Sequence, residues 1–509
     1  MSCSSWGSDA GPIVQTIFAR RTTTGGAWHD VRAVDRGLPP GRSVSRPTWN
    51  GPSSRVVGTS PLDASRHGVF TRCQPRATRG PMLERDAHGA ATMGGLRLED
   101  LLDLGADAPR TPAYVYDVDA IVQAARDLAG GFEGAPHLIA YAVKANTAGP
   151  IVRALGAAGC GAEVVSGGEL AVALGAGFPA DVILFSGVAK TSREIDQAIG
   201  VGDRGILALQ MESVEEITRV AARARALGRK ARVSFRVNPS VEADTHAHVA
   251  TGHDEAKFGI ALADLPAAYE AIDRAGDALE LMGIGCHIGS QLTRTDEYLE
   301  GARVVLDLAA ERRATGKPLA YLDFGGGYGV DYGAGCPVTP ADFARAATRL
   351  AAERGFGGTR IVVEPGRALV APYGVLCASV VMAKRSRGEP SRRWLMIDAG
   401  MNDLVRPALY GAKHRIEPID RPPPAAGEAP GYRVVGPVCE SSDDFGEHPF
   451  AELLPRAVVI RDAGAYGFVM ASEYNGRGLP TEIFLAGGRV AAIHESRDAA
   501  AWAASRLFG

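Results

Sequence analysis

The sequence predicts an α/β fold joined to a β fold: a (β/α)8 TIM-type barrel with a C-terminal antiparallel β-sheet or β-barrel domain. Between Pro136 and Arg367, eight short apolar segments alternate with stretches rich in Ala, Leu and Arg, as parallel strands alternate with helices. After Arg367 the pattern changes to strand-like segments separated by Gly and Pro. The alternative for the first region is an open doubly wound sheet, but eight strand–helix units favour a closed barrel.

The barrel strands are predicted from short apolar runs, at residues 138–143, 162–165, 182–185, 205–209, 232–237, 283–288, 321–324 and 360–363. Helices are predicted between them, for example at 214–227 and 339–354. Thr191 and Ser213 stand just before two of the predicted helices, where their hydroxyls can accept hydrogen bonds from the first free N–H groups. These signals define the barrel as residues 117–368.

The second domain is predicted from β-branched segments bounded by turn residues, at 375–382, 394–397, 433–435, 456–460, 482–485 and 490–493. The strand-like segment 113–116 precedes the barrel and is expected to join this sheet. The β domain is therefore assigned residues 95–116 and 369–509.

The first 80 residues differ from the rest, with eleven Arg, no Lys, four Asp and little periodicity. Residues 1–94 are interpreted as a disordered extension or as the product of a wrongly assigned start, with Met82 or Met93 as the true start. An Arg-rich, acid-poor leader also resembles an organelle transit peptide, so organelle targeting stays open.

The composition sets limits on function. The formal net charge of -3 gives no electrostatic case for binding nucleic acid or an anionic membrane. No apolar stretch approaches the 18 residues of a spanning helix. The seven cysteines are scattered and contain no CxxC pair, which argues against a disulfide framework or a zinc site and favours a reducing compartment, the cytoplasm.

Lys144 is the most informative residue, because it ends the apolar run 138–143. Burying an ammonium group is costly, so a lysine at the end of a buried strand is a candidate Schiff-base former. In a barrel, the carboxyl ends of the strands carry the chemistry. The other predicted strands also end in polar or glycine-rich residues, which strengthens this interpretation.

Glycines and a carboxylate follow the last two strands. Gly325, Gly326, Gly327 and Gly366 are predicted to bind a phosphate, since loops after strands seven and eight commonly do so in this fold. The structural alternative for the triplet is a tight turn. Glu364 ends the eighth strand and suits a protonated pyridine nitrogen, the alternative being a buried salt bridge with an arginine.

Three further residues are candidates from their positions. His287 ends the sixth strand and is expected to stack on a cofactor ring, with Ser290 reaching the phosphate; the alternative is a core histidine. Cys439 precedes an acidic, hydroxyl-rich stretch, which suggests a partly exposed loop and a thiol that donates a proton to a carbanion.

Together these motifs resemble the fold type III pyridoxal-phosphate-dependent decarboxylases, and among them the diaminopimelate decarboxylases, over roughly residues 96–492. The resemblance implies pyridoxal 5'-phosphate (PLP) as cofactor and meso-2,6-diaminopimelate, a small amino acid, as substrate. It rests on matching segments in this chain at residues 141–146, 165–170, 257–259, 287–291, 325–327, 364–367 and 436–441.

The resemblance also implies roles for single residues. Lys144 carries the cofactor, His287 stacks on its ring, Glu364 pairs with the ring nitrogen, and Ser290, the four glycines, Arg367 and Tyr474 complete the cofactor site. Cys439 reaches the active site of the second subunit, so a symmetric homodimer with shared active sites is implied.

The substrate residues implied by the family are Arg367, Arg406, Tyr410, Glu440 and Tyr474. Diaminopimelate carries a second carboxylate, which an arginine can clamp with two hydrogen bonds, and ornithine lacks it. The ornithine enzymes of the family carry aspartate where this chain has Glu440. Glu163 stands where many relatives have aspartate, and Ser442 replaces a common glycine.

Three alternatives remain open at this stage. The same cofactor residues would serve a decarboxylase of ornithine, arginine or carboxynorspermidine, which changes only the distal pocket. A catalytically silent relative that binds PLP is a second possibility, although Lys144, His287, Glu364 and Cys439 are all present. A racemase is a third, but racemases place an arginine against the ring nitrogen.

Overall fold

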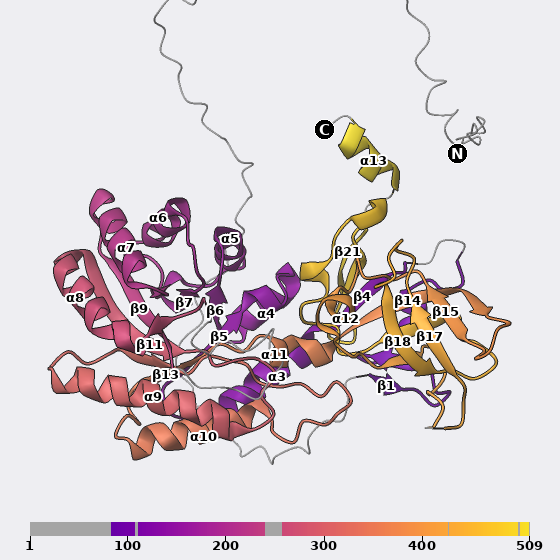
Figure 1. The fold of residues 1–509 in the computed structure, drawn as a ribbon, viewed down its shortest axis with the longest axis horizontal. Coiled ribbons are helices and arrows are strands. Elements are labelled where there is room, and N and C mark those ends of the chain that lie inside the picture. Colours follow the sequence, from indigo (N-terminus) through magenta and orange to yellow (C-terminus); the bar gives the residue numbers. More distant parts are fainter. Residues whose placement is uncertain (1–82, 107–109, 240–256, 426, 497–498, 508–509) are drawn as a thin grey trace, which may run out of the picture. The chain divides into compact units, whose positions relative to one another are not determined.

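The computed structural model describes residues 83–106, 110–239, 257–425, 427–496 and 499–507, all within the unit Arg76–Gly509. These residues form a parallel barrel, a mixed β-sheet and a small three-stranded sheet (Figure 1). Residues 1–82, the larger part of the leader predicted at 1–94, lie outside the described residues.

Eight parallel strands close into the predicted barrel, which excludes the open doubly wound sheet. Pairing runs through neighbours in chain order, and β13 returns to β5 to close the ring. The strands are β5 (His137–Ala142), β6 (Gly161–Val164), β7 (Ile183–Phe185), β8 (Ala208–Met211), β9 (Ala231–Asn238), β11 (Leu279–Cys286), β12 (Tyr321–Asp323) and β13 (Arg360–Val363). A two-residue strand, β10 (Ile260–Ala261), adds to β9.

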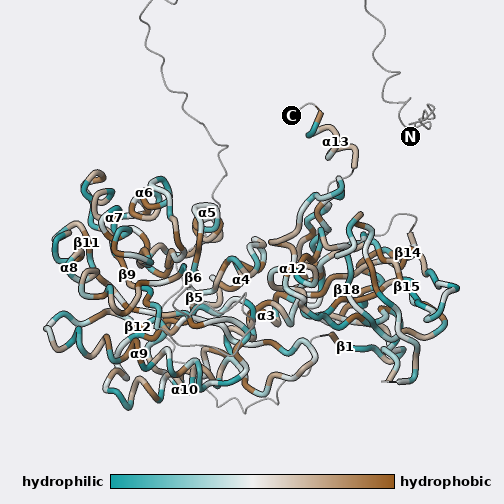
Figure 2. The backbone as a smooth tube through the Cα atoms, in the orientation of Figure 1, coloured by the Kyte–Doolittle hydropathy of each residue, from teal (hydrophilic) through white to brown (hydrophobic). Residues whose placement is uncertain are grey.

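Each barrel strand is followed by a helix: α4 (Gly149–Ala157), α5 (Gly167–Gly175), α6 (Ser192–Gly200), α7 (Val214–Ala226), α8 (Leu265–Ala275), α9 (Thr295–Ala314), α10 (Pro340–Glu353) and α11 (Arg367–Val370). The predicted caps are confirmed, because the hydroxyls of Thr191 and Ser213 accept hydrogen bonds from Glu194 and Glu216 N–H. Figure 1 shows α6 to α10 outside the strands. In Figure 2 apolar residues run along the strands and alternate with polar residues along the helices, as a core between the two layers requires.

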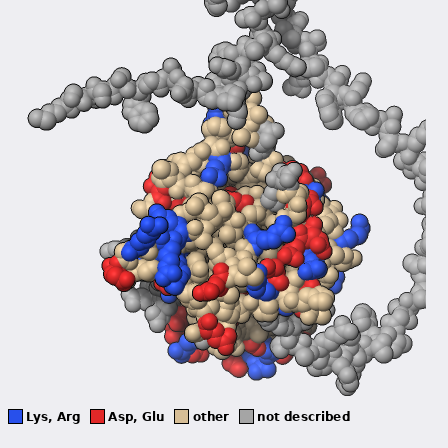
Figure 3. All heavy atoms as spheres, turned by 90° about the vertical axis from the view of Figure 1, so that its right-hand side faces the viewer, with Lys and Arg blue, Asp and Glu red and all other residues tan. Residues whose placement is uncertain are grey.

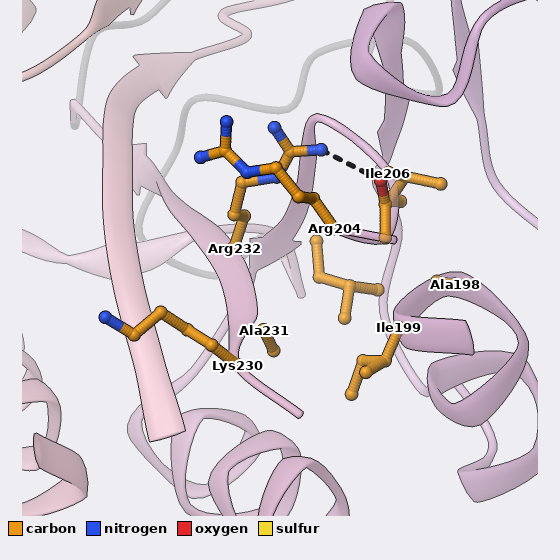
Figure 4. A pocket seen from close by; sticks show the side chains of 9 residues that line it. Ala198, Ile199, Arg204, Ile206, Lys230, Ala231 and Arg232 are labelled. Carbon is orange, nitrogen blue, oxygen red and sulfur yellow. Dashed lines mark hydrogen bonds between the residues drawn. The ribbon is translucent and has the colours of Figure 1, made fainter. Parts of the chain in front are cut away.

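The amino ends of the strands are filled by side chains. An apolar cluster closes this end from inside: Leu138, Ala140, Leu184, Leu207, Ala208, Tyr321 and Val362. Beside it, Arg232 donates through Nη2 to the carbonyl of Gly205 at 2.8 Å, and Arg204 lies against Arg232 (Figure 4). The pocket that these arginines line has a volume of about 10 Å³, roughly enough for one water.

The second sheet is mixed rather than antiparallel as predicted, since β15 pairs with β17 and β20 with β4 in parallel. Its strands are β4 (Ala113–Asp117), β14 (Gly374–Arg385), β15 (Arg393–Ile397), β16 (Ile416–Pro418), β17 (Gly431–Val435), β18 (Asp444–Pro449), β19 (Ala457–Ile460), β20 (Thr481–Ala486) and β21 (Arg489–His494). The expected membership of 113–116 is confirmed by the pairing of β4 with β14 and β20. Helix α3 (Val118–Gly130) then leads from β4 into the barrel.

The predicted boundary of the leader at residue 94 is wrong for its last part. Strands β1 (Glu84–Arg85), β2 (Ala91–Met93) and β3 (Leu96–Arg97) form an antiparallel sheet, and helix α2 (Leu98–Leu101) follows. Met93 is buried at 1% exposure, and Ala91 N–H donates to the carbonyl of Ile419. Strands of two or three residues are too short to produce a periodic pattern, so the sequence did not reveal them.

The surface of the described residues is mixed in charge. On the face drawn in Figure 3, basic and acidic side chains lie among larger uncharged areas. Within the part of the chain that the structure describes, no helix is long and apolar enough to cross a membrane.

Candidate active site

Lys144 lies in a single 3-10 turn, Val143–Ala145, directly after β5. The strand therefore ends two residues before the lysine, and the turn directs Nζ across to β6. There Nζ donates to Oε2 of Glu163 at 2.8 Å, and the Glu163 side chain is fully buried. Burial disfavours the ammonium, but the carboxylate of Glu163, with Tyr466 and Glu364, outweighs it and raises the pKa of Lys144.

Lys190 is a second lysine of the barrel, and unlike Lys144 it is buried. Its Nζ donates to the carbonyls of Gly187 and Gln210 and to Oε1 of Glu216. All three ammonium hydrogens are thus used, so Lys190 is held as a structural cation. Lys144, with a 40% exposed side chain, can reach a bound molecule.

Two buried carboxyl groups meet at the ends of β12 and β13. Burial raises the pKa of Asp323 to about 6, and burial with Asp323 and Glu163 nearby raises the pKa of Glu364 well above its usual range. Two neighbouring carboxylates in a buried site repel each other strongly. The pair Asp323 and Glu364 therefore holds a proton near neutral pH. Oε1 of Glu364 is buried and has no hydrogen-bond partner among the described residues.

His287 follows β11 and is neutral. Burial, with the charges of Arg236 and Lys144 nearby, lowers its pKa well below the usual value. Gly326 N–H donates to its Nδ1 at 3.2 Å, so the ring proton is on Nε2. The backbone of the glycine loop therefore fixes both the tautomer and the orientation of this ring.

The glycine triplet is required by close packing of three loops. A Cβ at Gly326 would lie 2.1 Å from the carbonyl oxygen of Glu364, and one at Gly327 would lie 2.2 Å from that of Gly289. Gly325 and Gly327 also have positive φ angles, of 66° and 93°. The tight-turn interpretation is therefore correct, and a phosphate role would come in addition to it.

Arg367 and Arg406 form the centre of a cationic cluster beside these residues. Both donate to the hydroxyl of Tyr332, at 3.1 and 3.3 Å, and Arg367 also donates to Ser290 at 3.1 Å. Arg406 is buried at 6% exposure. Among the described residues, neither arginine forms an ion pair with a carboxylate, so two guanidinium charges remain uncompensated.

The partners of Arg406 keep it charged and fixed. His414 Nε2 accepts from Arg406 Nη1 at 3.0 Å, while Nδ1 donates to the carbonyl of Arg461 at 2.8 Å. Burial and Arg406 lower the pKa of His414 to about 3, so the imidazole stays neutral. The Tyr332 ring lies under the Arg406 guanidinium at 5.1 Å.

Three predicted site residues lie elsewhere, in an exposed cluster. Cys439, Glu440 and Tyr474 are all exposed, which confirms that the thiol lies on an open loop. The Tyr474 hydroxyl donates to Glu440 Oε1 at 2.5 Å, and this hydrogen bond and the charge of Glu440 raise the pKa of Tyr474. Among the described residues, no hydrogen bond joins this cluster to Lys144. Tyr410 is exposed as well, but its hydroxyl affects the pKa of Arg367, so it belongs to the arginine cluster.

Sequence reasoning missed several residues that the site brings together. Arg236 and Asp323 are charged residues within apolar strands, the same signal that identified Lys144, and Glu163 was noted only as a departure from the family. Tyr332, His414 and Tyr466 lie in loops, where no periodic pattern marks them.

The residues present fit PLP. A buried carboxyl oxygen without a partner suits a protonated ring nitrogen, and a half-exposed lysine suits an aldehyde. A neutral flat imidazole suits ring stacking, and uncompensated guanidinium groups suit a phosphate. Among the described residues, no group of His, Cys, Asp and Glu side chains could hold a metal ion.

Residues 118–371 match the family model described as pyridoxal-dependent decarboxylase, pyridoxal binding domain. The chain is 38% identical over 395 residues to the diaminopimelate decarboxylase of Zymomonas mobilis, covering 76% of this chain and 90% of the relative.

Two solved structures are also similar. The Helicobacter pylori diaminopimelate decarboxylase complexed with L-lysine matches with a TM-score of 0.71 at 36% identity, over 78% of this chain and 96% of that one. The M. jannaschii diaminopimelate decarboxylase in co-complex with L-lysine matches with a TM-score of 0.74 at 33% identity, over 84% and 98%. Identity at this level over nearly the full length of the relatives, together with the barrel and its lysine, shows that the chain belongs to the diaminopimelate decarboxylase family of pyridoxal-dependent enzymes.

Proposed function

We propose that this protein decarboxylates meso-2,6-diaminopimelate to L-lysine and CO2, the last step of lysine biosynthesis, with PLP held at Lys144. The observation that carries the proposal is the pair of arginines Arg367 and Arg406, which both donate to Tyr332 and have no carboxylate partner among the described residues. A cofactor phosphate and a distal substrate carboxylate are two anions that would compensate them. The relatives named above support the same reaction, since L-lysine, its product, is bound in two of their structures.

PLP, when bound, supplies an electron sink for the carbon that loses its carboxylate. Lys144 is the residue that would hold the aldehyde group. Glu364, whose Oε1 has no partner among the described residues, would pair with the ring nitrogen, and Asp323 lies beside it. His287, whose ring is oriented by the N–H of Gly326, would cover one face of the ring.

The phosphate site is narrower than the sequence suggested. The N–H groups of Gly325 and Gly326 already donate to Asp323 and His287. We therefore assign the phosphate to Gly327 and Gly366, with Ser290 and Arg367, while Gly325 and Gly326 shape the loop. Ser290 and Arg367 are already hydrogen-bonded to each other, so they would bind a phosphate as a unit.

Arg406 is the proposed receptor for the distal carboxylate. It is buried, fixed by Tyr332 and His414, and offers a planar fork of donors. Tyr410, near Arg367, would contact the same end of the substrate. Ornithine has no distal carboxylate and would leave this arginine uncompensated, which predicts strong discrimination against it.

The exposed cluster is proposed to complete the active site of a second copy in a symmetric homodimer. Cys439 would donate a proton to the substrate α-carbon after CO2 leaves, and Glu440 and Tyr474 would contact the substrate. This explains why three polar residues with catalytic chemistry lie exposed on a single chain. The exposed thiol also favours a reducing compartment, and we propose the cytoplasm.

The test is CO2 release from purified protein supplied with PLP, comparing meso-diaminopimelate with L-ornithine and L-arginine. Release from diaminopimelate alone is expected. Arg406→Gln should lower kcat/KM for diaminopimelate at least about 30-fold, and Arg406→Lys, which keeps the charge but not the fork, should recover part of this loss. Release from ornithine or arginine instead would overturn the assignment of Arg406. PLP binding without release from any substrate would identify a catalytically silent relative.

A further inference from the structure

The C-terminal helix α13 (Ala499–Leu507) has no buried residue, yet it makes specific contacts with one turn. That turn, η7 (Tyr474–Gly476), carries Tyr474. The indole of Trp502 packs directly on Gly476, where an added Cβ would lie 3.0 Å from the ring. Arg506 of α13 forms an ion pair with Glu473 at 3.1 Å. The helix therefore holds the residues on both sides of Tyr474 and Asn475.

The turn that α13 contacts is an Asn-Gly turn with a left-handed backbone. Asn475 and Gly476 both have positive φ angles, of 58° and 69°. Asn-Gly is the dipeptide that most readily adopts two consecutive left-handed conformations, so the turn forms from its own residues and α13 adds contacts to it. The flat indole packs against Gly476, where a side chain would be crowded, and Arg506 lies over the same indole at 5.6 Å.

The same turn holds the loop of the proposed proton donor. The side-chain oxygen Oδ1 of Asn475 accepts from the backbone N–H of Cys439 at 2.8 Å, and the Tyr474 hydroxyl donates to Glu440. A chain of contacts thus runs from Trp502 and Arg506 through the turn to Cys439. Glu473 is the more protected partner of the Arg506 pair, with a side chain only 26% exposed.

We infer that Trp502 and Arg506 are positioning residues that hold Cys439 and Tyr474 in their working geometry. This inference rests on the proposed function for the catalytic role of Cys439. Small displacements of a catalytic group lower rates strongly, so loosening α13 should lower kcat while leaving PLP at Lys144 undisturbed.

The experiment uses the full-length holoenzyme with Trp502→Ala, Trp502→Phe and Arg506→Gln. Trp502→Ala should lower kcat about tenfold, and Trp502→Phe, which keeps a flat ring on Gly476, should return it to within about twofold of the wild type. Arg506→Gln should lower kcat about threefold, and the exchanged pair Glu473→Arg with Arg506→Glu should restore it. PLP absorbance should be equal in all variants. Lys317→Gln, which breaks an exposed ion pair with Asp273 in the barrel, is the control and should change nothing.

A second readout does not depend on turnover. The rate at which a thiol reagent modifies Cys439, measured as the difference from Cys439→Ser, should rise several-fold in Trp502→Ala and in Arg506→Gln. Unchanged thiol rates and unchanged kcat in both variants would overturn the inference. Failure of the wild type to release CO2 would instead overturn the proposed function, and the thiol rates would still decide whether α13 holds the loop. If Trp502→Ala does not fold, the kcat values of Arg506→Gln and of the exchanged pair, with the thiol rate of Arg506→Gln, test the inference without it.

Discussion

The Lys144–Glu163 ion pair controls how readily the lysine can react with an aldehyde, because only the neutral amine is nucleophilic. The carboxylate raises the pKa of Lys144 against the effect of burial. Glu163→Gln should therefore lower that pKa and shift the pH dependence of PLP recombination with apoprotein to lower pH, by about one unit or more. The measurement is the rate of the absorbance change over a range of pH. Superimposable profiles for wild type and variant would contradict the assignment; the exposed Glu353→Gln on α10 is the control.

The raised pKa of Asp323 predicts how the free energy of unfolding changes with pH. Its pKa rises from 3.8 to about 6 on folding, so between these values the folded apoprotein binds more protons than the unfolded chain. Its contribution to stability is therefore lost as pH rises from about 4 to 6. Asp323→Asn, a neutral mimic that can still accept from Gly325, should remove this loss, worth on the order of 2 kcal/mol. Urea unfolding at pH 4.5 and pH 7.5 tests it; a difference between wild type and variant that is independent of pH would refute the prediction.

Charged residues could be identified from the sequence where they lie within or at the end of an apolar strand. Lys144 and Glu364 were found in this way, and Asp323 and Arg236 carry the same signal. The loop residues Tyr332 and His414 could not be found, because their position beside Arg406 depends on how the loops fold over the barrel. The cofactor roles of the predicted residues remain predictions that the experiments above address.

Among the elements, the loop after β12 is the most constrained part of the site. Gly326→Ala would bring a Cβ against the Glu364 carbonyl, so the loop or the end of β13 must shift. We expect a destabilisation of roughly 1–3 kcal/mol together with weaker PLP binding. Thermal unfolding and PLP titration measure the two effects. Gly358→Ala, where an added Cβ meets nothing within 4 Å, is the matched control. Equal behaviour of the two variants would show that the loop tolerates a side chain.

The elements that the sequence predicted are those with strong periodicity. All eight barrel strands and the capped helices α6 and α7 follow from apolar runs and hydroxyl caps. Strand β18, with charged and half-exposed residues, and the two- and three-residue strands β1 to β3 were missed. Short or polar strands are specified by their neighbours in the sheet rather than by their own pattern.

At the scale of the whole molecule, the proposed homodimer divides each site between two chains. Lys144→Ala and Cys439→Ala each remove one half of every site. Mixed and reassociated, they should form heterodimers with one intact site, giving about one quarter of wild-type activity from an equal mixture. Each variant alone should be nearly inactive. An inactive mixture that has demonstrably exchanged subunits would place both residues in the same chain's site.

Borohydride reduction of the PLP-loaded protein, followed by peptide mapping, identifies directly whether Lys144 is the lysine that binds the cofactor. The chain has seven lysines, and Lys190 is buried in the barrel. The reduced pyridoxyl label is expected on Lys144 and should be lost in Lys144→Ala, because Lys190 is fully hydrogen-bonded to other groups. A label on Lys190 or any other lysine of the wild-type protein would contradict the assignment of Lys144 as the cofactor-binding lysine.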